Sequence, residues 1–348
     1  MNKNYYWIDL LRFFAAFIVL LNHSRGVFWC EYDDMQGNGK LLFYSITRMG
    51  HEAVLIFFVL SGYLVGGAAI KRIGIGTFDL KSYSINRSVR ILLPLFSAIL
   101  LYLITAHILN EEVNYWTCLG NLLSLQGILV PSLVGPFWSL SYEVWFYFLM
   151  GAVALLLNKR NVWTLFSLVL VLSVFAFLKP IYLLVWLIGA FAYVCQPQQR
   201  NGFLFYTSIL MMMLMVLCYQ FGRDSHGIGN FSFSFNIGLI ELVFSLFGAI
   251  FIQQIVLMRP EHKWSNCLNY LGIKLAAFSY TLYLVHQTIC LFIFKYFKMS
   301  RFDSLSWNNL LLYSLVLIIV LFIAWCIYCL FEKHTALVKK IINRWLLK

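Results

Sequence analysis

The chain has 348 residues, of which 61% are hydrophobic, 18% aromatic and only 11% charged, and its mean hydropathy is +0.80. A soluble domain needs far more polar surface, so this composition excludes an ordinary globular protein and indicates a membrane protein. The formal net charge of +12 does not indicate nucleic-acid binding, because Lys and Arg gather between apolar runs rather than along one face.

Ten apolar segments are candidates for membrane-spanning helices, since the hydrocarbon core of a bilayer needs about 20 helical residues. The fifth and sixth are short and separated only by Lys179 and Pro180, so they form either two spans or one tight hairpin of tilted helices. Residues 118–134 are interrupted by polar residues, Gly and Pro, which predicts a short outer helix or a re-entrant segment. The ten segments lie near residues 5–24, 52–70, 88–109, 137–157, 162–178, 181–195, 203–220, 236–257, 277–297 and 308–331.

The fold class predicted from these segments is all-α: a polytopic membrane protein with about ten transmembrane helices. A single membrane domain is expected over residues 1–348, with no appended soluble domain. With the N-terminus inside, 17 of the 26 basic residues fall in inner segments and eight in outer segments, while Arg12 lies within the membrane. Positively charged loops face the cytoplasm, so both termini are predicted to be cytoplasmic and the number of helices even.

The stretch "RFFAAFIVLLNH" carries a charge and a titratable ring on one apolar helix. Arg12 and His23 are eleven residues apart, which places them on one face about 16 Å apart along the axis. Asp9 is in reach of an ion pair with Arg12. Ionisable groups within a membrane are costly and mark a function or a water-filled cavity. The alternative is a structural Asp9–Arg12 pair near the inner interface, with His23 reaching the outer surface.

Two further stretches each allow either a structural or a functional interpretation. In "FFVLSGYLVGG", Ser61 and Gly62 belong to a strip of small residues, which favours close helix packing and alternatively offers a bare wall for a ligand chain. In "NRSVRILLPLF", Arg87 and Arg90 are about one turn apart at the inner end of a helix. Two guanidinium groups on one face suit a multiply charged phosphate ligand, and anchoring by the positive-inside rule is equally compatible.

The stretch "GPFWSLSYEVWFYF" places Trp138, Ser141, Tyr142 and Glu143 in the outer half of one helix. A lone carboxyl among aromatic side chains needs a partner, and His23 is the natural candidate. The alternative is a Glu that bonds a neighbouring helix and only holds the bundle together.

In "SYTLYLVH", Ser279, Tyr283 and His286 share a helical face. His286 either lines the same cavity or forms a hydrogen bond that bridges helices. Glu332 in "FEKH" is expected to balance the charge of Lys333 at the inner surface. The eight cysteines are scattered and no Cys/His cluster has metal-ligand spacing, so no metal site is predicted. Pairing of Cys30 with Cys118 is left open.

Together these motifs resemble the acyltransferase 3 family of integral-membrane acyltransferases along nearly the whole chain. The resemblance is carried, in order, by "IDLLRFFAAFIVLLNH", "FFVLSGYL", "INRSVRILLPLF", "FWSLSYEVWFY", "SYTLYLVH" and "FE". Two positions depart from it: Leu55 stands where many members have an acidic residue, and His334 where many have Pro.

The resemblance implies transfer of an acyl group, usually acetyl, from cytoplasmic acyl-CoA to a hydroxyl of a cell-surface or lipid-linked glycan at a bacterial inner membrane. Acyl-CoA would be a donor substrate, with no permanently bound cofactor and no nucleic-acid partner; membrane lipids would surround the chain. The implied catalytic residues are His23 as general base, Glu143 to orient or charge its ring, and Arg12. The other implied roles are donor binding by Arg87, Arg90, Ser61 and Gly62, and substrate binding by Trp138, Ser141, Tyr142, Tyr283 and His286.

Two other functions remain open from the sequence. A transporter or flippase for a lipid-linked glycan could have similar helices, although the paired repeats and broken helices typical of transporters are not visible. A structural membrane subunit would not need Arg12, His23 and Glu143 together. The acceptor sugar, the acyl chain length, the oligomeric state and the choice between direct transfer and an acyl-enzyme are not determined by the sequence.

Overall fold

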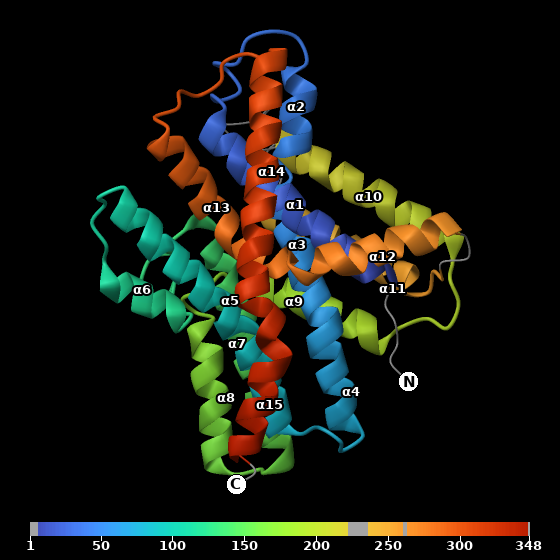
Figure 1. The fold of residues 1–348 in the computed structure, drawn as a ribbon. Helices are drawn as coiled ribbons and strands as arrows, with labels where there is room; N and C mark the ends of the chain where they lie inside the picture. The colour runs from blue at the N-terminus through green and yellow to red at the C-terminus, as the bar shows by residue number, and fades with distance from the viewer. Residues whose placement is uncertain (1–5, 222–235, 260–262, 347–348) are drawn as a thin grey trace. The chain divides into compact units, whose positions relative to one another are not determined.

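The computed structural model describes residues 6–221, 236–259 and 263–346, and these residues are mostly helical, without a strand (Figure 1). The α-helices are α1 (Tyr6–Phe28), α2 (Lys40–Thr47), α3 (Gly50–Ser61), α4 (Ala68–Gly74), α5 (Leu80–Ile108), α6 (Tyr115–Leu122), α7 (Trp138–Asn158), α8 (Val162–Val174), α9 (Ile181–Val194), α10 (Gly202–Phe221), α11 (Ile237–Val256), α12 (Lys263–Ala277), α13 (Ser279–Tyr296), α14 (Trp307–Leu330) and α15 (Thr335–Leu346). A π-helical turn (Gly62–Gly67) joins α3 to α4, and 3-10 turns (Gly135–Phe137 and Glu332–His334) precede α7 and α15.

The described part of the chain contains seven helices long and apolar enough to cross a membrane, or eight if α12 and α13 count as one broken span. This confirms an all-helical, multi-pass membrane protein. Each of the ten predicted segments contains a helix, but α8 and α9 have only 13 and 14 residues. At 1.5 Å per residue such helices are about 20 Å long, which is shorter than the hydrocarbon core. The count of ten is therefore not confirmed, and the orientation of the termini stays a prediction.

The chain divides into two compact units, each built from separate stretches of sequence. The first unit comprises Met1–Ile70, Ile181–Ser279 and Ser300–Leu315, and the second comprises Lys71–Pro180, Tyr280–Met299 and Val316–Lys348. Neither unit is a continuous domain. The single membrane domain expected from the sequence stays a prediction.

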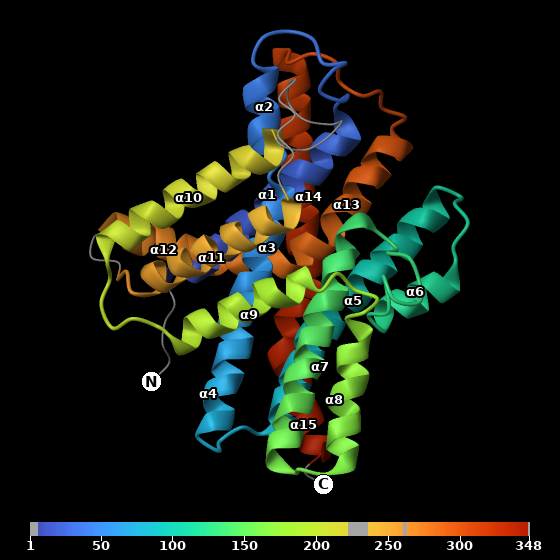
Figure 2. The same ribbon diagram turned by 180° about the vertical axis from the view of Figure 1, so that it is seen from behind.

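In the first unit, α1 packs against α3, α11 and α12, while α9 packs against α3 and α11. Helix α10 lies along α11 (Figures 1 and 2). The core between these helices is apolar, with Leu20, Val59, Val185 and Ile252 fully buried. Helix α10 is different, because only 6% of its most apolar 18-residue stretch is buried within the protein.

Glycine allows α3 and α9 to touch backbone to backbone. A Cβ added at Gly62 would lie 1.9 Å from the Trp186 carbonyl oxygen, and one added at Gly189 would lie 2.1 Å from that of Val59. The Trp186 indole donates a hydrogen bond to Ser61 Oγ at 3.3 Å. Small residues at such a contact are what close packing of membrane helices requires.

The end of α9 is covered by a side chain from α11. The amide of Gln253 donates to the carbonyl oxygens of Ala192, at 2.7 Å, and Cys195, at 3.2 Å. The last carbonyl groups of a helix have no partner within it, so this glutamine supplies donors that the helix itself lacks.

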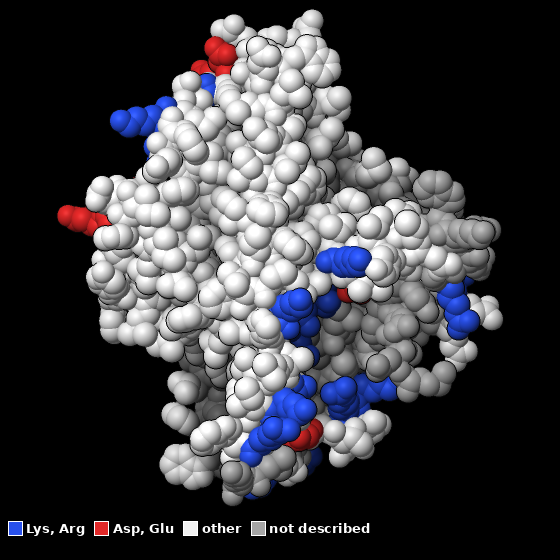
Figure 3. Space-filling model, in the orientation of Figure 1, with Lys and Arg blue, Asp and Glu red and all other residues white. Residues whose placement is uncertain are grey.

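In the second unit, α5 packs against α6, α7 and α15, and α7 lies beside α8 (Figure 2). Helix α5 begins at Leu80, eight residues before the predicted segment 88–109, because Asp79 caps it by accepting from the backbone of Lys81 and Ser82. Helix α6 begins before the interrupted region 118–134 and extends into its first residues, so a short helix is present there, while its outer location stays a prediction. Basic side chains gather over α15, which carries Lys339, Lys340 and Arg344 (Figure 3).

Candidate active site

Helix α1 carries the two first-unit residues that the sequence singled out. The Arg12 guanidinium lies 3.7 Å from the Asp9 carboxylate, so the predicted ion pair is present. Both side chains are partly exposed, Arg12 by 26% and Asp9 by 37%. An ion pair with this much exposure contributes at most about 1 kcal/mol to stability.

The position of His23 is set by the two residues beside it. The Ser24 and Tyr313 hydroxyl groups lie 2.7 Å apart and are buried, which ties α1 to the start of α14. On the other side, a Cβ added at Gly50 would lie 2.7 Å from the Asn22 side chain, so α3 begins directly against α1. His23 therefore lies on a segment of α1 that is held by two other helices.

Ser61 and Gly62 pack directly against α9, as the contacts with Trp186 show. These small residues therefore allow close helix packing, which is one of the two interpretations of the strip. Contact of Ser61 and Gly62 with an acyl donor stays a prediction.

A second ionisable pair in the first unit was not anticipated from the sequence. His51 Nε2 lies 2.6 Å from Glu241 Oε1, and the His51 ring stacks on Tyr219 with ring centres 5.3 Å apart. The Glu241 side chain is 8% exposed. The partners are 190 residues apart along the chain, so no local pattern could have paired them.

In the second unit, one tyrosine connects a predicted donor-binding arginine with the predicted catalytic carboxylate. The Arg87 guanidinium lies over the rings of Tyr83 and Tyr147, at 6.0 and 5.6 Å from their centres. These distances suit attraction between a cation and an aromatic face. The Tyr147 hydroxyl donates a hydrogen bond to Glu143 Oε1. Arg87 and Glu143 were assigned to opposite halves of the membrane from the sequence, yet both contact the same side chain.

Four more residues complete this group, which we call the arginine–carboxylate cluster. The charges of Glu143, Glu332 and Arg90 act on the buried hydroxyl of Tyr280. Thr281 donates to Glu332 Oε2 from its backbone N–H at 3.2 Å and from its hydroxyl at 2.5 Å. Glu332 therefore contacts the start of α13. The expectation that it balances the charge of Lys333 at the inner surface stays a prediction. The cluster comprises Arg87, Arg90, Glu143, Tyr147, Tyr280, Thr281 and Glu332.

Three predicted substrate-binding residues form contacts within α7 and its surroundings. Ser141, fully buried, donates to the Ser124 carbonyl oxygen at 3.0 Å, and the Tyr142 hydroxyl accepts from the Lys179 backbone at 2.9 Å. The rings of Trp138 and Tyr142 meet edge to face, with centres 5.7 Å apart. The two hydrogen bonds join α7 to the loop that precedes it and to the loop between α8 and α9. Substrate binding by the three residues stays a prediction.

The other two predicted substrate-binding residues lie on α13. The hydroxyl groups of Tyr283 and Ser139 lie 2.6 Å apart, and Tyr283 also donates to the Pro136 carbonyl oxygen at 3.1 Å. His286 is fully buried, with Nδ1 3.0 Å from the Leu282 carbonyl oxygen. Tyr283 thus joins α13 to the start of α7, whereas this contact of His286 lies within α13. Whether His286 lines a cavity or bridges helices stays a prediction.

A comparison with protein families identifies the chain. A family model for an acyltransferase domain, that of the acyltransferase 3 family, matches residues 5–329. The chain belongs to the acyltransferase 3 family. No curated protein and no solved structure matches it significantly.

Membership of the acyltransferase 3 family, with the apolar helices, makes the chain a membrane acyltransferase. The match contains six of the seven residues of the arginine–carboxylate cluster and ends three residues before the seventh, Glu332. Sequence reasoning did not assign a role to Tyr147 or Tyr280. Tyr147 could have been found, since residues four apart on a helix are neighbours and Glu143 precedes it by four. Tyr280 could not, because only the fold brings it near Glu143.

Proposed function

We propose that this acyltransferase transfers an acyl group, usually acetyl, from cytoplasmic acyl-CoA to a hydroxyl of a cell-surface or lipid-linked glycan at a bacterial inner membrane. The observation that carries this proposal is the contact of Arg87 and Glu143 with Tyr147. One cluster then offers guanidinium groups for an anionic donor and a carboxylate for the reaction.

Arg87 and Arg90 bind the phosphate groups of the donor, because guanidinium groups pair with phosphate through two parallel hydrogen bonds. The Arg87 side chain is partly buried and held by two aromatic rings, so its guanidinium loses little conformational freedom when the donor binds. Arg90 is exposed on the same helix and is one turn away.

His23 acts as the general base. It takes the proton of the acceptor hydroxyl as the oxygen attacks the thioester carbonyl carbon. The carbon–sulfur bond then breaks, and the released thiolate of CoA takes up a proton. A positioned base of this kind contributes about 10²- to 10⁴-fold to the rate. Glu143 favours the charged form of an imidazole or binds the acceptor, and Tyr147 orients the carboxylate in both cases.

The test is a donor assay with purified protein. Acetyl-CoA is supplied with and without an acceptor glycan, and free thiol is measured together with the mass of the glycan. The expected result is release of thiol that depends on the acceptor, with a matching gain of one acetyl group. Transport of the glycan without any release of thiol would instead support a transporter or flippase.

A further inference from the structure

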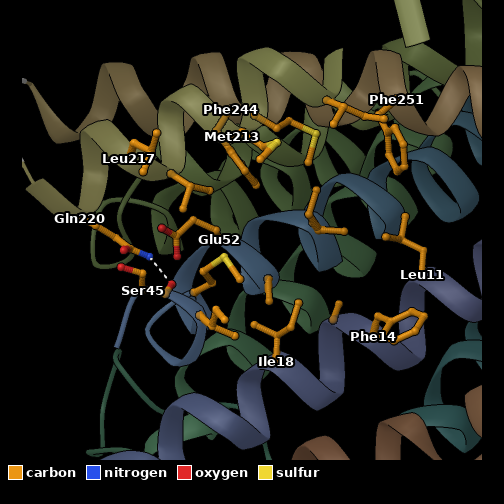
Figure 4. A pocket seen from close by; sticks show the side chains of 18 residues that line it. Leu11, Phe14, Ile18, Ser45, Glu52, Met213, Leu217, Gln220, Phe244 and Phe251 are labelled. Carbon is orange, nitrogen blue, oxygen red and sulfur yellow. Dashed lines mark hydrogen bonds between the residues drawn. The ribbon is translucent and has the colours of Figure 1, made fainter. Parts of the chain in front are cut away.

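The first unit contains a cavity of about 560 Å³ between α1, α3, α10 and α11 (Figure 4). Its walls are almost entirely apolar, with Phe14, Met213, Phe244 and Phe251 among the largest side chains. A water molecule accounts for about 30 Å³ of liquid, so the cavity has room for roughly 15 to 20 groups of that size. This volume fits one long hydrocarbon chain.

One end of the cavity is polar. Gln220 and Glu52 lie together there with Ser45, while Leu11 and Phe251 lie towards the opposite end (Figure 4). Gln220 is 4% exposed, and its Nε2 donates to the Ser45 carbonyl oxygen at 2.9 Å. Its Oε1 is buried and accepts no hydrogen bond from any residue that the structure describes. A buried acceptor without a donor is costly, so this oxygen is a position at which an occupant of the cavity can donate a hydrogen bond.

The cavity borders the surface that faces lipid. Two of its lining side chains, Phe14 on α1 and Met213 on α10, are 50% and 61% exposed. Both belong to helices apolar enough to span the membrane, so their exposed surfaces meet hydrocarbon. An occupant therefore reaches the cavity from the bilayer rather than from water.

The charges at the cavity restrict the head group of the occupant. Its lining contains no Lys, Arg or His, which leaves nothing to neutralise a phosphate or a carboxylate. The one ionisable side chain in the lining is the acidic Glu52. An uncharged head group avoids repulsion by the Glu52 carboxyl group, and a hydroxyl on it can donate a hydrogen bond to Gln220 Oε1.

We propose that this cavity binds one chain of a neutral glycerolipid, whose free hydroxyl donates a hydrogen bond to Gln220 Oε1. The chain lies along the apolar walls towards Leu11 and Phe251, and the glycerol lies at the Glu52 end. The lining contains none of the residues assigned above to acyl transfer.

The proposal is tested with photoreactive probes on the purified full-length protein in nanodiscs. Three probes share one long alkyl chain with a diazirine and end in glycerol, in carboxylate or in no polar group. The expected result is saturable labelling of lining residues on α1, α10 and α11 that monoolein displaces. The glycerol probe is expected to label about three- to tenfold better than the probe without a polar group, as one hydrogen bond predicts. Labelling that monoolein does not displace, or that favours the carboxylate probe, would overturn the proposal.

Variants separate the cavity from the general lipid surface. Met213→Trp blocks the cavity and is expected to lower labelling by the glycerol probe. Leu214→Trp is the matched control, because Leu214 neighbours Met213, is 45% exposed and does not line the cavity. Gln220→Leu is expected to remove the preference for glycerol while chain labelling remains. Equal labelling of the two tryptophan variants, or an unchanged preference in Gln220→Leu, would contradict the assigned site.

Discussion

The Arg87 guanidinium lies 5.6 Å from the centre of the Tyr147 ring, and the hydroxyl of that tyrosine donates a hydrogen bond to Glu143. Tyr147 of α7 thus contacts Arg87 of α5 through its ring and Glu143 of its own helix through its hydroxyl group. Tyr147 is therefore a shared contact of Arg87 and Glu143.

Tyr147→Phe separates the two contacts of this side chain. It keeps the ring under Arg87 but removes the hydrogen bond to Glu143, which as a bond to a charged group contributes roughly tenfold or more. We expect kcat to fall about tenfold while the KM for the acyl donor changes little. Tyr83→Phe is the control, since its ring also lies under Arg87 and its hydroxyl does not contact Glu143. Equal losses in both variants would show that the Tyr147 hydroxyl has no special role.

Arg87→Ala combined with Arg90→Ala is expected to raise the KM for acyl-CoA more than the KM for the acceptor, because the donor phosphates lose their guanidinium partners. Initial rates measured over a range of each substrate provide the comparison. Replacement by Ala of Arg200, which belongs to the first unit and not to the arginine–carboxylate cluster, provides a control for the loss of a positive charge. An unchanged donor KM would mean that the two arginines only anchor the helix.

His23→Ala is expected to abolish acyl transfer while the protein still inserts and purifies normally. The loss should reach about 10²- to 10⁴-fold, the contribution of a positioned general base. His107→Ala serves as the control, because His107 is exposed at the end of α5. Normal acyl transfer by His23→Ala, at normal expression, would remove His23 from the mechanism.

The hypothesis that His23 and Glu143 act together, which rests on the sequence, stays a prediction and needs a double variant. Glu143→Gln alone is expected to lower turnover sharply and to leave donor binding nearly intact. Combined with His23→Ala, it should be little worse than His23→Ala alone, since residues that act as one unit are not additive. Multiplying losses would assign Glu143 a separate task, such as binding the acceptor.

Gly62→Ala is expected to destabilise the protein by about 1–3 kcal/mol or to prevent folding, because the added methyl group overlaps the Trp186 carbonyl oxygen. Gly26→Ala, in α1, has nothing within 4 Å of the added Cβ and is expected to be neutral or to stabilise by up to about 1 kcal/mol. Thermal unfolding of both variants in the same detergent is the measurement. Similar melting temperatures would contradict the backbone contact between α3 and α9.

The orientation of the chain can be measured with single cysteines at positions 81 and 112, both exposed. The native thiols at Cys195 and Cys267 are exposed and must first be replaced. Lys81→Cys is expected to react with an impermeant maleimide only after the membrane is opened, and Glu112→Cys in intact cells. The opposite pattern would reverse the predicted orientation and the direction of acyl transfer.

Hydropathy predicted the membrane class and a helix within each of the ten segments, because burial of apolar side chains in lipid dominates the fold. It could not place the start of α5, whose first turns carry Lys81, Ser82 and Ser84 and are fixed by the cap at Asp79. It indicated that the fifth and sixth segments are short, but it could not show that α8 and α9 end after 13 and 14 residues, since apolar character says little about where a helix ends.

In the candidate site, contacts between residues near in sequence could be predicted, and contacts between residues far apart in sequence could not. The Asp9–Arg12 pair followed from helical spacing, because its members are three residues apart. The contacts of Glu332 with Thr281 and of Ser139 with Tyr283 join residues 51 and 144 positions apart, so only the folded chain reveals them.

The short length of α9 affects how the protein is made. Its 14 residues end before a bilayer does, and the carbonyl groups of Ala192 and Cys195 receive their donors from Gln253. The ribosome completes α9 almost sixty residues before it reaches this glutamine. These two carbonyl groups therefore lack their Gln253 donors until α11 has been synthesised. The order of synthesis makes the contact that covers the end of α9 one of the later contacts of the first unit to form.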